Sequence, residues 1–341
     1  MSFRWNRFFR SLGLTLAIGL LVWGVMRFSG GLGEADQVEP AILVEATQKA
    51  ITAVRARQPG DRRPASYDAI LAPLDQLLEQ AKNLLESLEY NPVGSYPELF
   101  NLTDPVIRLA TEANQMAANE TGPLAKEFRF QQQKAEACRY LATGMWNRLQ
   151  ANQSSQTSGA YASDTPTLAP AEVAAVLRVV NEGLAANLDN DHLYYLRAVV
   201  HRSNGSFPAA ANDLRKALEI NPENAEAWNV LGLVEIGLKD FDQAEADLEK
   251  AKAILLAEAK DSESQPGSAY ISTLFNLARF HEGLSANYAR EDRLNPTPEN
   301  TALLNRHQAA ARAYLKEFLE REPANSPDAK LAERLLSNLA D

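Results

Sequence analysis

The chain has 341 residues, which is long enough for two domains. Its formal net charge is −10, and residues 1–30 hold four Arg and no acidic residue, so that residues 31–341 carry −14. This acidic body argues against nucleic-acid binding, which requires a basic surface, and the single cysteine excludes an intramolecular disulfide.

The N-terminal segment contains an uncharged apolar run, LGLTLAIGLLVWGV, at residues 12–25. Counted more generously from 11 to 28, the run is at the short end of what spans a bilayer, about 17–25 residues. Three arginines precede it and one follows it, which predicts a cytoplasmic N-terminus and a translocated body. A cleavable signal peptide is the alternative, but no A-x-A site follows the run. We therefore expect a single-pass membrane protein, with the cytoplasmic tip and the anchor in residues 1–36 and an extracytoplasmic body.

Residues 37–150 are expected to form a membrane-proximal helical region. Helices are predicted at residues 40–57, from about Pro73 onward, at 104–119 and at 123–150. The second start is placed near Pro73 because proline fits only the first turn of a helix. Asp104-Pro105 has the form of an N-cap followed by proline at the first helical position, so the third helix is expected to begin there.

The second of these helices carries the most regular apolar stripe of the region. Its members step by four and three residues and are Ile70, Leu74, Leu77, Ala81, Leu84 and Leu88. This spacing is also that of a coiled coil, so one interpretation is a homodimer through residues 70–88. The other is an ordinary core helix, which the extra width given by Leu71, Leu78 and Leu85 favours.

Residues 151–169 are rich in Ser, Thr and Gly, have no apolar period and are predicted to be a linker. After the linker, similar residues recur at an offset of 34. The pairs are Tyr194/Trp228, Ala198/Gly232, Phe207/Phe241, Ala210/Ala244, Leu214/Leu248 and Ala217/Ala251. This period, with the sequence Trp228-x-x-Leu231-Gly232, resembles the tetratricopeptide repeat. The first copy departs from the family pattern in having Arg197 where the pattern has Leu.

The resemblance implies that residues 170–341 form a short α-α superhelix. Each repeat is two antiparallel helices that bury their apolar faces against neighbouring repeats. The small residues of the pairs are expected where two helix backbones approach closely. Asn204-Gly205 and Lys239-Asp240 are expected to form the turns inside the hairpins, and residues 173–187 are expected to cap the stack as half a repeat.

A third repeat is interrupted by extra residues. Leu274-x-x-Leu277-Ala278 has the spacing of a first helix, and Ala311-x-x-x-Leu315-x-x-Phe318 has that of a second helix. The insertion near 285–305 is expected to lengthen both helices and to join them by a projecting tip. The tip is either a tolerated surface insertion or a contact specific to a partner. Residues 328–339 are predicted to be a closing helix.

The sequence lacks the motifs of common catalytic and metal sites. It has no Gly-rich phosphate loop, no H-E-x-x-H, no cysteine pair and no nucleophile elbow. His201 and His281 fall at the repeat position that faces the partner helix, and Cys138 lies on an apolar stripe, so all three are expected to be structural. The acidic residues expected on the solvent side of a repeat helix are Glu245, Asp247 and Glu249. We predict no catalytic residue, no metal site and no cofactor.

The resemblance also implies that the first helices line an inner groove that binds other proteins. The corresponding positions of this chain are Tyr195, Val199, Arg202, Asn229, Leu233 and Ile236, with Phe275 and Arg279 in the third repeat. Some members of the family hold a peptide's C-terminal carboxylates with basic residues, and this chain has none at the matching positions. The mostly apolar wall is predicted to take an apolar peptide or an amphipathic helix. The alternative is that the helices of 38–150 already cover the groove.

Together these features predict an all-α protein with an N-terminal transmembrane helix, a helical region and a short superhelix. The predicted function is that of a non-enzymatic, membrane-anchored adaptor or scaffold that binds membrane-associated proteins, in assembly or quality control of a membrane complex. No nucleic acid is expected among its partners. Two alternatives stay open, namely a self-associating structural membrane protein and an accessory subunit of an enzyme.

Overall fold

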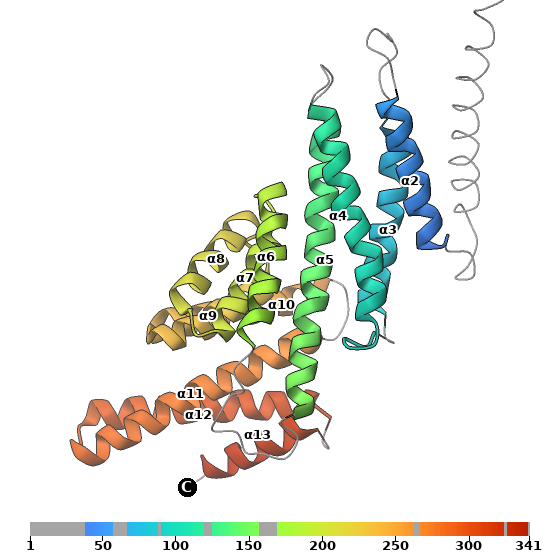
Figure 1. The fold of residues 1–341 in the computed structure, drawn as a ribbon. Coiled ribbons are helices and arrows are strands. Elements are labelled where there is room, and N and C mark those ends of the chain that lie inside the picture. Colours follow the sequence, from blue (N-terminus) through green and yellow to red (C-terminus); the bar gives the residue numbers. More distant parts are fainter. Residues whose placement is uncertain are drawn as a thin grey trace, which may run out of the picture. The chain divides into compact units, whose positions relative to one another are not determined.

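The computed structural model describes residues 38–56, 67–87, 90–118, 125–156, 169–261, 266–323 and 326–339. These residues form α-helices and connecting turns, with no strand among them (Figure 1). The chain divides into two compact units, residues 1–193 and 194–341, and each unit is described by itself. The predicted all-α class is therefore confirmed for the part of the chain that the structure describes.

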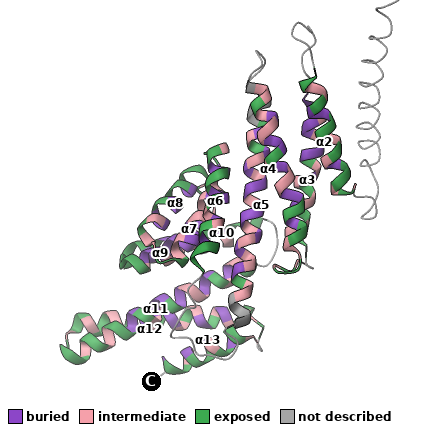
Figure 2. Ribbon diagram, viewed as in Figure 1, coloured by how far each residue is buried: buried purple, intermediate pink, exposed green. Residues whose placement is uncertain are grey.

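The first unit is built of five described helices. They are α2 (Pro40–Arg55), α3 (Asp68–Glu86), α4 (Tyr96–Ala118), α5 (Ala125–Gln156) and α6 (Pro170–Ala186). Consecutive helices of this series pack against each other (Figure 1). The core of α2 to α5 contains Leu43, Leu74, Leu99, Val106 and Phe130, all almost completely buried. In Figure 2 the buried positions lie on the helix faces that turn toward neighbouring helices, as amphipathic helices require.

Two helices begin earlier than predicted. The prediction placed a proline in the first turn of each helix, but in the structure the proline lies farther inside. α3 begins five residues before Pro73, and α4 begins at Tyr96 rather than at Asp104. A proline removes one intrahelical hydrogen bond and crowds the preceding turn. However, Pro73 is itself buried, and Val106, which follows Pro105 in α4, is a buried core residue. Packing of the apolar face stabilises each helix across its proline, since tertiary burial contributes most of the stability of a helix in a protein.

The apolar stripe of α3 lies inside the first unit. Ile70, Leu74, Leu77 and Ala81 are completely buried in its core. A face that is covered by α2, α4 and α5 is not free to pair with a second copy of the chain. The structure therefore favours the core-helix interpretation over a coiled-coil homodimer.

The single cysteine has the environment expected of a structural thiol. Cys138 is buried, and burial raises the pKa of its thiol to about 12, with a further contribution from Glu182 and an opposing one from Lys134. The nucleophilic form of cysteine is the thiolate. Cys138 is therefore unreactive near neutral pH and serves as a small apolar side chain.

The predicted single-pass membrane arrangement requires correction. No helix among the described residues is both long and apolar enough to cross a bilayer. Even α5, with 32 residues, carries charged side chains such as Lys134, Glu136 and Arg139. The apolar run at 12–25 belongs to residues 1–37, which lie outside the described residues. The structure gives no support to a membrane anchor, a cytoplasmic N-terminus or an extracytoplasmic body.

The second unit begins within α7 and continues through three helical hairpins. Its helices are α7 (Asp191–Ser203), α8 (Phe207–Ile220), α9 (Ala225–Leu238), α10 (Phe241–Asp261), α11 (Ser268–Leu294), α12 (Pro298–Arg321) and α13 (Pro327–Asn338). Each helix from α8 onward packs against the next one in the chain. The bounds predicted for the repeat domain, 170–341, remain a prediction, because α6 packs on α5 in the first unit.

The first two hairpins repeat in register. Asp191 and Ala225, which begin α7 and α9, are 34 residues apart, and so are Phe207 and Phe241, which begin α8 and α10. An ideal Cβ at Gly232 would lie 2.7 Å from the side chain of Leu248 and 3.0 Å from a backbone oxygen of α10. Only a residue without a side chain fits here without displacement. The expected close approach of two helices at a small residue is therefore observed.

The turns inside these hairpins have the same backbone geometry. Gly205 and Lys239 adopt left-handed conformations, with φ of 72° and 64°. In each case the next N–H donates a hydrogen bond to a carbonyl five residues earlier, at 2.9 Å in the first hairpin and 3.0 Å in the second. This bond, with the left-handed residue before it, is the Schellman ending of a helix. The turns predicted at Asn204-Gly205 and Lys239-Asp240 lie at these helix ends.

The third hairpin is longer than the first two. α11 has 27 residues and α12 has 24, whereas α8 and α9 have 14 each. Residues 295–297 join them, and the Thr297 hydroxyl caps α12 by accepting the N–H of Asn300 at 3.0 Å. The expected lengthening of both helices and the tip between them are observed. Leu274, Ala278, Ala311, Leu315 and Phe318 form the core of this hairpin with residues of α13.

Candidate protein-binding surface

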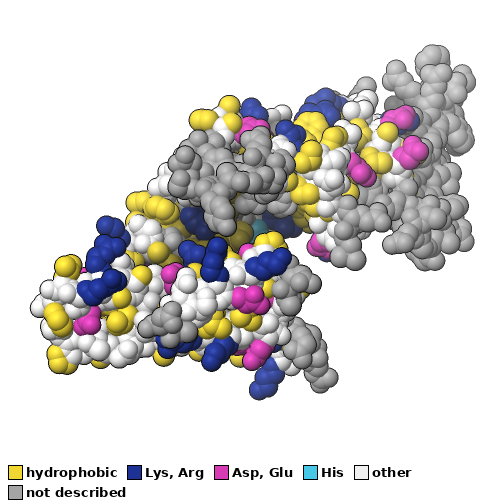
Figure 3. Space-filling model, turned by 90° about the horizontal axis from the view of Figure 1, so that it is seen from below, with side chains coloured by type: hydrophobic (Ala, Val, Ile, Leu, Met, Phe, Trp, Pro, Cys, Tyr) yellow, Lys and Arg dark blue, Asp and Glu magenta, His cyan; other side chains and the backbone are white. Residues whose placement is uncertain are grey.

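The first helices of the second and third hairpins are neighbours in the second unit. α9 contacts α11 directly, and Asn276 Nδ2 donates a hydrogen bond to Asn229 Oδ1 at 3.0 Å. On the face drawn in Figure 3, acidic, basic and apolar side chains are interspersed. On this face, local hollows are therefore better candidates for a binding surface than a broad charged area.

The predicted groove residues on α7 are more enclosed than expected. Val199 is buried, while Tyr195 and Arg202 are half-buried. Burial raises the pKa of Tyr195 above its usual value, with a further contribution from Glu226. Burial lowers the pKa of Arg202, and Tyr195 opposes this shift. These side chains thus contact neighbouring residues over much of their surface.

The predicted groove residues on α9 also take part in helix packing. Asn229 is hydrogen-bonded to Asn276, and Ile236 packs against a core cluster that includes Leu277 and Phe280. Leu233 is half-buried. On α11, Phe275 is half-buried, whereas the predicted Arg279 is exposed. The assignment of these positions to partner binding remains a prediction.

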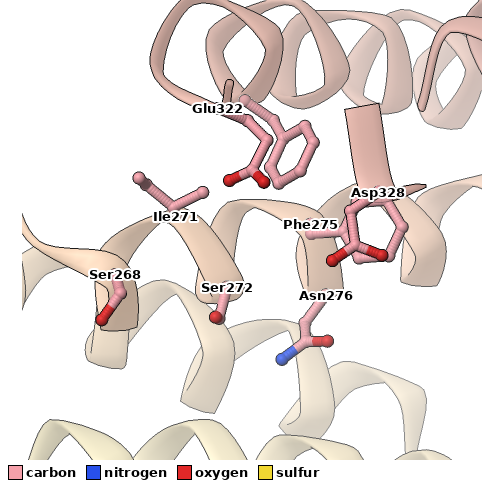
Figure 4. Close-up of a pocket in the computed structure, with 8 residues that line it drawn as sticks. Ser268, Ile271, Ser272, Phe275, Asn276, Glu322 and Asp328 are labelled. Atoms are coloured by element: carbon pink, nitrogen blue, oxygen red, sulfur yellow. The ribbon is translucent and has the colours of Figure 1, made fainter. Parts of the chain in front are cut away.

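A pocket of about 250 Å³ opens beside Phe275. Its lining residues are Ser268, Ile271, Ser272, Phe275 and Asn276 of α11, Phe318 near the end of α12, Glu322 just after it, and Asp328 of α13. Figure 4 shows the α11 side chains along one side of the pocket and Glu322 and Asp328 on the other side, with their carboxylates turned toward α11. The pocket therefore combines an apolar interior with an acidic rim.

The local sequence explains how these side chains are positioned. Residues three and four apart on a helix share one face, which places the α11 residues in two adjacent rows. The Phe275 and Phe318 rings are 5.0 Å apart between centroids, so the hairpin core extends into the pocket. The Ser326 hydroxyl accepts the N–H of Ala329 at 3.0 Å and fixes the start of α13, which carries Asp328.

Most of the pocket could not be found from the repeat pattern. The pattern identified Phe275 because it follows Leu274 as Asn229 follows Trp228. Glu322 and Asp328 lie at the junction of α12 and α13, which is not part of a repeat. The sequence did contain a signal for the position of Asp328. Ser326-Pro327-Asp328 has the form of a helix start, where an acidic residue in the first turn is favourable.

A second pocket, of about 300 Å³, lies between α10, α11 and α12. It is lined by Lys239, Asp240, Phe241, Asp242, Glu245, Leu284, Tyr288, Leu303, Arg306 and His307. Charges of both signs occur here, and Arg306 pairs with Glu245 at 3.0 Å. Because part of its charge is satisfied internally, this pocket offers less to a ligand than the pocket beside Phe275.

One position of the first helix is polar in all three hairpins, namely His201, Glu235 and His281. Each faces the second helix of its own hairpin. In the first hairpin, Arg197 donates two hydrogen bonds to Asp213, at 2.8 and 2.7 Å, and His201 Nε2 lies 3.8 Å from the same carboxylate. The departure of Arg197 from the repeat pattern is thereby explained, since it neutralises a largely buried acid.

The second hairpin lacks that arginine, because Leu231 occupies the equivalent position. Glu235 and Asp247 are both buried, and Arg215 approaches Glu235 at 3.3 Å from an exposed position. Burial and a hydrogen bond with Asp247 raise the pKa of Glu235 to about 8. A proton on Glu235 supplies the donor that two adjacent carboxylates otherwise lack. The prediction that Asp247 lies on the solvent side is wrong.

The third hairpin places two histidines at this level. Nδ1 of His281 lies 2.9 Å from Nδ1 of His307, and the His281 ring stacks on Tyr314 with 5.6 Å between centroids. Burial lowers the pKa of His281 to about 4 and also lowers that of His307. Both rings are buried and neutral near pH 7, and the expected structural role of His281 is supported by its contact with α12.

The titratable pairs are packing elements of the hairpins, and of their members only His307 also lines a described pocket. Glu235, Asp247, His281 and His307 are all less than 9% exposed. Among the described residues, no group of three or more His, Cys, Asp or Glu side chains is arranged to hold a metal ion. Of the features described, the pocket beside Phe275 is the best candidate for recognition of another molecule.

Comparisons with known proteins bear on the same segment of the chain. Residues 198–235 match the family described as TPR repeat, and residues 225–254 match the family described as Tetratricopeptide repeat. Heat shock protein STI1 of Saccharomyces cerevisiae is 37% identical over 62 residues, which is 18% of this chain. The chain spans only 10% of the length of that curated relative.

Solved structures give weaker similarities. A crystal structure of MamA protein has a TM-score of 0.31 and 17% identity, over 65% of this chain and 94% of that chain. The crystal structure of yeast Tom70 has a TM-score of 0.28 and 13% identity, over 97% of this chain and 80% of that chain. These values carry no argument beyond the family matches.

The 34-residue register, the equivalent hairpin turns and the family matches all fall on α7 to α10. The hairpins of this segment are therefore tetratricopeptide repeats.

Proposed function

We propose that this protein is a non-enzymatic scaffold whose second unit binds a segment of another protein along α7, α9 and α11. The observation that carries this proposal is the pocket at Phe275, which lies on α11 at the repeat position of Tyr195 and Asn229. A hollow with an apolar interior and a few polar groups is typical of recognition sites. The pocket beside Phe275 continues the predicted groove positions of α7 and α9 onto the third hairpin.

Two further observations support a scaffold rather than an enzyme. Glu235, Asp247 and His281 are buried between helices and line neither of the two pockets described. The thiol of Cys138 has a pKa raised to about 12, so it is not a nucleophile near neutral pH. Binding of a protein segment along α7, α9 and α11 requires neither the buried titratable side chains nor the Cys138 thiol.

Site-specific photo-crosslinking in the full chain tests the proposal. A photoreactive phenylalanine analogue replaces Leu233 on α9, and the matched control places it at Lys250, which is exposed on α10. After irradiation of cells that produce the protein, we expect a discrete crosslinked partner from position 233 and none from position 250. The partner, identified by mass spectrometry and purified, should then bind the full chain directly. Absence of a crosslink at position 233, or equal labelling at both positions, contradicts the proposal.

A further inference from the structure

We propose that the pocket beside Phe275 selects partner segments in which a bulky apolar side chain is flanked by Lys or Arg. The inference rests on the proposed scaffold function and adds the chemical class of the segment that is bound. It derives from the size of the pocket, its apolar interior and the charge of its rim.

The interior of the pocket fits a side chain rather than a small molecule. Ile271, Phe275 and Phe318 contribute its apolar surface, and the two phenylalanine rings are in tilted contact at 5.0 Å. Its volume of about 250 Å³ lies below the range of about 300–1,000 Å³ that is usual for small-molecule sites. One or two apolar side chains of a peptide would fill this space and remove the exposed part of Phe275 from water.

The rim of the pocket carries negative charge only. Glu322 and Asp328 are its charged members, and no Lys or Arg lines it. Neither carboxylate forms an ion pair with another described residue, while the adjacent Arg321 pairs with Glu317 at 3.4 Å. Figure 4 shows both carboxylates directed toward the α11 side of the pocket. A cationic side chain on the partner would therefore find acceptors that no residue of the described chain neutralises.

The α11 side of the pocket offers hydrogen bonds to an extended backbone. Ser272 is exposed and presents a hydroxyl, and Asn276 uses its Nδ2 to reach Asn229 while its carbonyl oxygen remains an acceptor. These groups can orient a segment without distinguishing its sequence. Selectivity then comes from the apolar side chain and the adjacent positive charge, because like charges at a rim disfavour the wrong partner.

The charge of the whole chain acts in the same direction. The net charge of −10 attracts a cationic segment at long range and repels an acidic one. The pocket is thus opposite in sign to a site that holds a peptide carboxylate with basic side chains. An acidic segment, or a free C-terminal carboxylate next to Glu322 and Asp328, would meet repulsion.

The test uses the full chain and two short labelled peptides. Both have a Leu-Phe centre, which Lys flanks in one peptide and Glu in the other. Fluorescence anisotropy is measured at low and high ionic strength for the unchanged protein and for Glu322→Gln/Asp328→Asn. The matched control, Glu291→Gln/Glu333→Gln, removes two exposed charges away from the pocket. Circular dichroism checks that each variant retains its helical content.

We expect the Lys peptide to bind at least about tenfold more tightly than the Glu peptide. The rim variant should lose about tenfold in affinity for the Lys peptide together with most of the salt dependence, and the control variant should lose neither. A Phe275→Ala variant that stays folded should weaken binding at both ionic strengths.

Equal affinity for both peptides, binding of neither, or a rim variant that behaves like the control would overturn the inference. If a partner is nevertheless crosslinked through position 233, the scaffold function stands and only this choice of segment is wrong. If position 233 captures no partner while the Lys peptide binds as expected, the pocket selects basic segments but the extended binding row is wrong.

Discussion

His201, Glu235 and His281 occupy the same place in successive first helices, and each faces a polar side chain of its second helix. In the first hairpin the contacted group is the carboxylate of Asp213, which is paired with an arginine. In the second hairpin the contact is between two carboxyl groups, and in the third it is between two histidines. The same backbone frame therefore holds three different charge states. Buried polar groups are tolerated only where each finds a partner. A substitution on one side of such a pair would therefore leave its partner unsatisfied unless the other side changes as well.

The carboxyl pair makes the stability of the second unit depend on pH. Because the pKa of Glu235 is raised from 4.5 to about 8 in the folded chain, folding favours its protonated form. Its contribution is present below pH 4.5 and is lost as the pH rises toward 8. We expect Glu235→Gln, which keeps a donor beside Asp247, to raise the free energy of unfolding at pH 8 by about 1–3 kcal/mol. Urea denaturation at pH 5 and pH 8 measures this difference. A gain of the same size at both pH values would show that the carboxyl is ionised throughout.

Lys239, the left-handed residue that ends α9, allows a test of how backbone conformation affects stability. Lys239 has φ of 64° and is exposed, and its counterpart Gly205 has φ of 72°. The left-handed conformation costs a residue with a side chain about 1–2 kcal/mol. Lys239→Gly should therefore raise the free energy of unfolding by about 1 kcal/mol, and Gly205→Ala should lower it by a similar amount. Chemical denaturation gives both values, and a loss of stability in Lys239→Gly would contradict the argument.

At the scale of the helices, the long α11–α12 hairpin buries both of its histidines. His281 and His307 lie between Tyr314 and Tyr288, and Glu245 of α10 lies 3.9 Å from His281 Nε2. Arg306 also contributes to the lowered pKa of both rings, whereas Glu245 opposes it. Protonation of this pair is thus disfavoured in the folded hairpin near neutral pH.

This arrangement predicts a loss of stability in acid. The pKa of His281 falls from 6.5 to about 4 on folding, so its contribution is present above pH 6.5 and is lost as the pH falls toward 4. Glu235 has the opposite trend over part of this range, so the comparison is made in the Glu235→Gln background. There, unfolding midpoints in urea should fall more steeply between pH 7 and pH 5 with both histidines present than in His281→Gln/His307→Gln. Parallel curves would exclude the histidine pair as the cause.

The sequence predicted helices well where one periodicity acts alone. The 34-residue offset located α7 to α10 because each pair of equivalent residues has the same neighbours in its hairpin. Pro73 and Pro105 misled the prediction of helix starts, since tertiary burial outweighs a local breaker. Asp247 was misplaced because its protonated partner Glu235 is not recognisable from charge alone. The acidic rim of the pocket beside Phe275 escaped prediction because Glu322 and Asp328 lie at the junction of α12 and α13, outside the repeat spacing.

At the scale of the whole chain, the repeat stack depends on a cover at its C-terminal end. α13 places Ala332 and Leu335 against the core that contains Phe318, and Leu339 directly after the helix joins them. In repeat proteins each unit is stabilised mainly by its neighbours, and terminal elements shield the last apolar face. The same helix supplies Asp328 to the pocket, so the cover and the candidate binding site are built together.

Removal of this cover should affect both stability and binding. A chain that ends at Pro323 loses the burial of two leucines, each of which contributes about 1.5–3 kcal/mol. We expect unfolding at a clearly lower urea concentration and stronger binding of a hydrophobic dye. Lys330→Ala, at an exposed position of α13, serves as the control and should leave both unchanged. A truncated chain as stable as the full one would show that α13 is not part of the core.

The tip between α11 and α12 has a practical consequence for studies of this protein. Residues 295–297 are closed by local hydrogen bonds, including one from Asn300 Nδ2 to the carbonyl of Asn295 at 3.1 Å, and Leu294 beside them is 80% exposed. Neither pocket is lined by residues 294–297. An epitope or a fluorophore grafted at this bend would report on the protein in cells while leaving both described pockets intact.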